Sequence, residues 1–77
     1  MKMKCAVACS NSNGEPDFFF CIVDCSQDEY DDGKHYDVAK DEADKNGYDA
    51  YLVYDENDPG SVILQHCEWS SVDTIKV

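Results

Sequence analysis

The residues best suited to chemistry are four cysteines near the N-terminus. They form two Cys-x-x-x-Cys units in CAVACSNSNGEPDFFFCIVDC, residues 5 to 25. Thiols spaced in this way can bind zinc, form disulfides or pack in a core as small apolar side chains. The segment FFFCIVDC is aromatic and β-branched, and NSNGEPD is rich in turn formers, so the sequence predicts two strands joined by a turn.

Strand geometry decides among these three uses. Cysteines four residues apart on a strand lie roughly 13 Å from each other. A tetrahedral zinc ion needs four sulfurs at about 2.3 Å, so one four-cysteine site is excluded unless the strands break. Cysteines facing across two strands lie wider apart than a relaxed disulfide requires. We therefore expect buried core thiols, with a redox-labile pair as the alternative.

Two registers of this hairpin are compatible with the sequence. We favour a loop over residues 13–17, which pairs Cys5 with Cys25. The alternative is a two-residue turn at residues 13–14, but it places Pro16 inside a strand, where a ladder donor is lost. In either register alternation gives the first strand a core face that includes Cys5.

A helix is predicted from Lys34 to Asn46, because the Asn46-Gly47 pair is a natural left-handed stop. Before it, Ser26 and Glu29 match a capping box that starts a short turn, which Gly33 interrupts. The helix is expected to bury a stripe that faces the sheet. The stripe consists of Tyr36, Ala39 and Ala43, joined at its edge by Val38 or His35.

The second half of the chain indicates further strands. DAYLVYD alternates as a strand, DENDPG is a turn, and SVILQHCEW is predicted as its hairpin partner. The tail SSVDTIKV is either a final strand or a loose end. The fold class is therefore α+β in the order ββαββ, a mostly antiparallel sheet of four to five strands with one helix on one face. Residues 1–77 form a single small acidic domain.

Motifs for catalysis or cofactor binding are weak, so we expect no enzyme, no catalytic residues, no metal and no cofactor. Asp55, Asn57 and Gly60 match the opening of a calcium loop, but His66 stands where the bidentate acid belongs. His66 and Cys67 are adjacent on a predicted strand and point to opposite faces. A structural or surface role is expected for both histidines, and sheet packing accounts for Tyr51, Tyr54 and Trp69.

Charge is the dominant feature of the chain. Seventeen acids against six bases give a net charge of −11, and residues 28 to 58 hold twelve acids and three lysines. Direct binding to nucleic acid or to an acidic membrane is disfavoured, because both need a basic surface. The short apolar N-terminal run is typical of neither a signal peptide nor a membrane span, so we expect a cytoplasmic protein. The expected partner is basic.

Helix carboxylates one turn apart lie at about the spacing of backbone phosphates. We therefore expect a small acidic interaction protein that competes with nucleic acid for a basic site on a nucleic-acid-binding protein. In size, acidity and lack of motif it resembles the inhibitors that phages and mobile elements carry against CRISPR and restriction systems. The alternative is a soluble acidic domain with a calcium-binding or thiol-redox role. The expected contact residues are Asp28, Glu29, Tyr30, Asp31, Asp32, Asp37, Asp41 and Asp44. An exposed strand edge in the final segment could pair with a second copy of the chain, so a homodimer is a further alternative.

Overall fold

The computed structural model describes all residues from Met1 to Val77 and consists of a four-stranded sheet with helices on both faces. The strands are β1 (Lys2–Ser10), β2 (Pro16–Asp24), β3 (Asp49–Asp55) and β4 (Thr74–Lys76). The helices are α1 (Gln27–Asp31), α2 (Lys34–Lys45) and the 3-10 helices η1 (Ser61–His66) and η2 (Trp69–Ser71).

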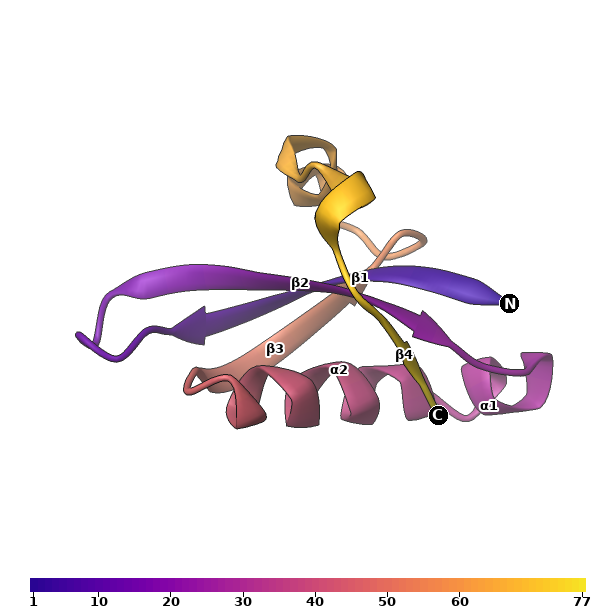
Figure 1. The fold of residues 1–77 in the computed structure, drawn as a ribbon. Helices are drawn as coiled ribbons and strands as arrows, with labels where there is room; N and C mark the ends of the chain where they lie inside the picture. Colours follow the sequence, from indigo (N-terminus) through magenta and orange to yellow (C-terminus); the bar gives the residue numbers. More distant parts are fainter.

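The sheet has the strand order β3-β1-β2-β4. Strand β1 is antiparallel to both of its neighbours, whereas the short β4 runs parallel to β2. The α+β class and the mostly antiparallel sheet of four strands are thereby confirmed, and the sheet is mixed because of β4. Helix α2 lies against one face of this sheet, with α1 at its N-terminal end (Figure 1).

The hairpin of β1 and β2 has neither of the registers considered from the sequence. Cys5 pairs with Cys21, so the predicted pairing of Cys5 with Cys25 is wrong. The turn lies between Ser10 and Pro16, where the Asn11 side chain accepts hydrogen bonds from the backbone of residues 13 and 15. Pro16 is the first residue of its strand, a position at which the missing donor is tolerated.

The correct and the predicted registers differ by four residues, an even number. An even shift leaves every side chain on its own face of the sheet, because the side-chain period of a strand is two residues. Cys5, Cys21 and Cys25 therefore all lie in the core, as expected, although their partners differ. This core is formed mainly by small side chains, and Ala39 and Ala43 of α2 allow the helix to approach the sheet closely.

The predicted helix is confirmed. Helix α2 begins at Lys34 after Gly33, whose φ of 74° separates it from α1, and ends before Gly47 at φ 87°. The capping box of Ser26 and Glu29 is also present. Ala39 and Ala43 lie in the core as predicted, and His35, one of the two residues predicted at the edge of the stripe, is buried with them, whereas Tyr36 is only half-buried. No helix of the structure has the length and apolar character that crossing a membrane requires.

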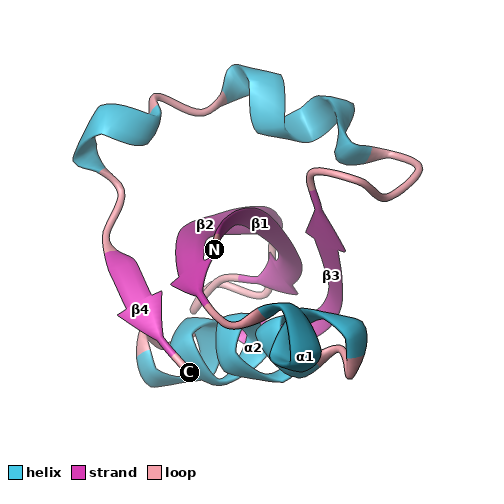
Figure 2. Cartoon of the chain, turned by 90° about the vertical axis from the view of Figure 1, so that its right-hand side faces the viewer, coloured by secondary structure: helices cyan, strands magenta, loops and turns pink.

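The segment after β3 is not the predicted hairpin strand. Residues 61–69 form η1 and the start of η2, which arch over the face of the sheet opposite α2 (Figure 2). Gly60, at φ 88°, turns the chain onto this path. Leu64 is buried there, and the Trp69 indole Nε1 donates a hydrogen bond to the Leu64 carbonyl. The arch carries the chain across to β2, so the tail supplies the fourth strand.

Candidate functional site

The acidic residues predicted to contact a partner lie on α1, on α2 and in the turn between these two helices. Six of them have exposed side chains: Asp28, Asp31, Asp32, Asp37, Asp41 and Asp44. On α2 the buried residues His35, Ala39 and Ala43 face the sheet. With 3.6 residues per turn, Asp37, Asp41 and Asp44 point to the opposite side, into solvent. We call these six carboxylates the acidic helix face.

The carboxylates of the acidic helix face have no cationic partners. The ion pairs of the structure join the Met1 ammonium to Asp24 and His35 to Asp55. None of the six lysines forms an ion pair with a carboxylate. Asp44 accepts a weak hydrogen bond of 3.4 Å from the Ala50 amide, and Asp31 accepts one of 2.9 Å from the Gln27 side chain. Neither contact neutralises charge, so the face is strongly negative.

Two of the predicted contact residues have roles inside the fold. The Glu29 carboxylate accepts a hydrogen bond of 2.8 Å from the Ser26 amide, which lowers the pKa of Glu29. Tyr30 is half-buried, its ring stacks on His35 with centroids 4.7 Å apart, and its hydroxyl accepts a hydrogen bond from Asn57. These contacts fix both side chains, so Tyr30 is held against the core beside the acidic helix face.

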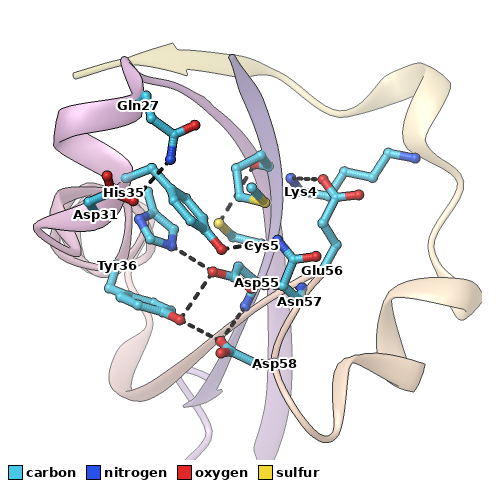
Figure 3. Close-up of polar contacts among 12 residues, drawn as sticks. Lys4, Cys5, Gln27, Asp31, His35, Tyr36, Asp55, Glu56, Asn57 and Asp58 are labelled. Atoms are coloured by element: carbon cyan, nitrogen blue, oxygen red, sulfur yellow. Dashed lines mark hydrogen bonds and ion pairs between the residues drawn. The ribbon is translucent and has the colours of Figure 1, made fainter.

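A second polar cluster lies where α2 meets the end of β3 (Figure 3). The imidazole Nε2 of His35 lies 2.7 Å from Oδ2 of Asp55, and each residue is 1% exposed. The same carboxylate accepts hydrogen bonds from the Tyr36 hydroxyl at 3.1 Å and the Asn57 amide at 2.8 Å. Three donors around one buried carboxylate offset the cost of removing it from water.

Tyr36 extends this cluster to the surface. Its one hydroxyl proton is shared between the carboxylates of Asp55 and Asp58, with the shorter contact of 2.7 Å to Oδ2 of Asp58, and the Asp55 backbone amide donates to the same Asp58 oxygen at 2.9 Å. Burial and the two neighbouring carboxylates raise the pKa of Tyr36 well above its usual value. The tyrosine therefore stays a neutral hydrogen-bond donor, and it holds the turn after β3 against α2.

The partial calcium-loop pattern falls in this cluster. Its first residue, Asp55, has a buried carboxylate that is surrounded by His35, Tyr36 and Asn57. No group of three or more His, Cys, Asp or Glu side chains is arranged to hold a metal ion. The pattern thus corresponds to a structural turn that joins β3 to α2.

The four N-terminal cysteines lie in the core as free thiols. The Cys5 thiol donates a hydrogen bond of 3.7 Å to the Met3 carbonyl. Contact with the Cys21 thiol, together with burial, raises the pKa of Cys5. Burial also raises the pKa of Cys9 and Cys25. Buried thiols of raised pKa are poor nucleophiles, so Cys5, Cys9 and Cys25 contribute packing.

The sequence does not predict the pairing of His35 with Asp55. Helix periodicity places His35 at the edge of the buried stripe, and the only motif that includes Asp55 is the partial calcium loop. A usable signal exists in the helix periodicity, because His35, Ala39 and Ala43 follow one another at four-residue intervals. A buried histidine needs a polar partner. The nearby segment that is rich in Asp and Asn, residues 55–60, supplies that partner.

Comparison of the chain with models of protein families, with curated proteins and with solved structures finds no match.

Proposed function

We propose that this chain is a small acidic, non-enzymatic protein that binds a basic, nucleic-acid-binding protein and competes there with nucleic acid. The observation that carries the proposal is the acidic helix face, six exposed carboxylates without a cationic partner. Unpaired surface charges of one sign steer an oppositely charged partner and set its orientation. A cytoplasmic inhibitor of the anti-CRISPR or anti-restriction type, carried by a phage or mobile element, is the biological role we propose.

The arrangement on α2 supports mimicry of a nucleic-acid backbone. Asp37, Asp41 and Asp44 follow one another at intervals of one helical turn, which spaces their Cβ atoms by about 5–6 Å. Helix α2 is held against the sheet by Ala39 and Ala43, which are both 0% exposed. A rigid support keeps these charges in one arrangement, and that reduces the entropy cost of binding.

A charge-reversal experiment tests the proposal. Asp37→Lys combined with Asp41→Lys should abolish capture of the partner while leaving the unfolding midpoint in urea nearly unchanged, because both side chains are exposed. Glu15→Lys with Glu68→Lys changes the net charge equally at exposed positions outside the helices and is the matched control. Equal loss of capture in both double variants, or parallel loss of capture and stability, would contradict a specific role of this face.

A further inference from the structure

A groove runs beside the acidic helix face, between α2 and the edge strand β3. Its volume is about 280 Å³. The helix contributes Tyr36, Asp37 and Lys40, the strand contributes Tyr51 and Leu52, and the turn after β3 contributes Asp58. Sheet packing was expected for Tyr51, but its side chain is 62% exposed and Leu52 is 49% exposed. Both are available to a ligand.

Asp58 gives this groove a fixed negative group. Its Oδ2 accepts hydrogen bonds from the Tyr36 hydroxyl at 2.7 Å and from the Asp55 amide at 2.9 Å (Figure 3). Both contacts use the same oxygen, so Oδ1 is left to accept from a ligand. A carboxylate that is already oriented loses little conformational entropy when a donor binds. Asp58 is thus preorganised, unlike the freely solvated carboxylate of Asp37.

The other walls of the groove favour a planar cation. Two tyrosine rings offer surfaces on which a guanidinium group can stack, and the two carboxylates can accept its N–H groups. Lysine is less suited, because its ammonium is strongly hydrated and cannot stack as a plane. The apolar side chain of Leu52 can cover the methylene stem of an arginine.

We propose that this groove binds an arginine side chain of the basic partner. The inference rests on the proposed function and deepens it, since the acidic helix face would attract the partner and the groove would anchor it. Lys40 at the groove opposes binding through its positive charge and forms no ion pair of its own. Its removal should therefore strengthen binding, whereas neutralising Asp58 should weaken it.

The test uses a short synthetic peptide and needs no knowledge of the partner. A capped Gly-Ser-Arg-Ser-Gly peptide is titrated into the isotope-labelled full chain, and chemical shifts are followed by NMR. Saturable shifts are expected at Tyr36, Tyr51 and Asp58. The same peptide with citrulline, a neutral isostere of arginine, should produce none of them. A lysine peptide should bind more weakly.

Single substitutions show which residues are responsible for binding of the arginine peptide. Asp58→Asn should weaken arginine binding by about fivefold or more, because one charge-assisted contact is lost, whereas Asp31→Asn, outside the groove, should leave it unchanged. Lys40→Met is a second test in case Asp58→Asn disturbs the turn. Lys40 is exposed, so this variant should fold normally, and it should bind the arginine peptide more tightly. Shifts that do not saturate, that spread over the acidic helix face beyond Asp37, or that persist with citrulline would overturn the proposal, as would unchanged affinity in Lys40→Met.

Failure of this inference can be distinguished from failure of the proposed function. If a partner is captured and Asp37→Lys with Asp41→Lys releases it, but the arginine peptide does not bind in the groove, the function stands and the anchor is wrong. If the peptide binds in the groove but no nucleic-acid-binding protein is captured, the arginine site stands and the proposed function is wrong.

Discussion

His35 and Asp55 join helix α2 to the end of strand β3 through a contact of 2.7 Å between Nε2 and Oδ2, buried on all sides. The imidazole lies between Tyr30 and Tyr36, with ring centroids at 4.7 and 4.1 Å. Its other nitrogen, Nδ1, is buried without a hydrogen-bond partner. This pair therefore fixes where the helix sits on the sheet, and with it the position of the acidic helix face.

Asp55→Ala should be strongly destabilising. It leaves the His35 imidazole and the Asn57 backbone amide without their acceptor, and each buried donor left unsatisfied costs about 1–3 kcal/mol. Urea unfolding followed by circular dichroism measures the loss. Asp49→Ala, at an exposed acid of the same strand, should change the free energy of unfolding by less than about 0.5 kcal/mol. Similar losses in the two variants would show that the buried pair does not hold the helix in place.

The thiols should divide into two groups by reactivity. Cys5, Cys9, Cys21 and Cys25 are buried, whereas Cys67 is half-buried on the arch. A thiol reagent added to the native protein should therefore modify Cys67 first and reach the four core thiols only after unfolding. Mass spectrometry of the modified protein gives the order. Fast modification of Cys5 or Cys21 in the folded state would instead support a redox role for that pair.

The capping box predicts a specific dependence on pH. The pKa of Glu29 is lowered in the folded state by its hydrogen bond to the Ser26 amide. The stabilisation is fully present above the unfolded pKa of about 4.3 and is lost as the pH falls through the lower folded pKa. The stability difference between wild type and Glu29→Ala should thus be larger at neutral pH than in acid. A difference that does not change with pH would argue against this hydrogen bond.

The part of the fold that could be predicted depends on short-range chemistry. Gly33 and Gly47 fix the boundaries of α2 locally, and Ser26 does the same for the start of α1, so the predicted limits of α2 agree with the structure within one residue. The faces of β1 and β2 also followed from alternation. The register did not, because the Asn11 side chain organises a turn that lies earlier in the chain than the predicted loop over residues 13–17.

The arch and the groove could not be predicted in the same way. An apolar run as short as residues 61–69 suits a strand or a helical turn equally, and only the path to β2 decides between them. Trp69 illustrates this, since its position is set by contacts with Phe20, at a centroid distance of 5.8 Å, and with Lys4. Tertiary contacts of this kind are invisible in the local pattern. The exposed acids on α2 were predictable because helical spacing alone places them on one face.

The most direct test of the central claim is capture from a bacterial lysate with the immobilised chain, at low and high salt, with and without added DNA. Captured proteins are identified by mass spectrometry, and the Asp37→Lys, Asp41→Lys double variant serves as the control. We predict enrichment of a nucleic-acid-binding protein that salt and DNA both displace and that the variant does not retain. Capture that DNA leaves unchanged, or no specific capture at all, would contradict competition with nucleic acid.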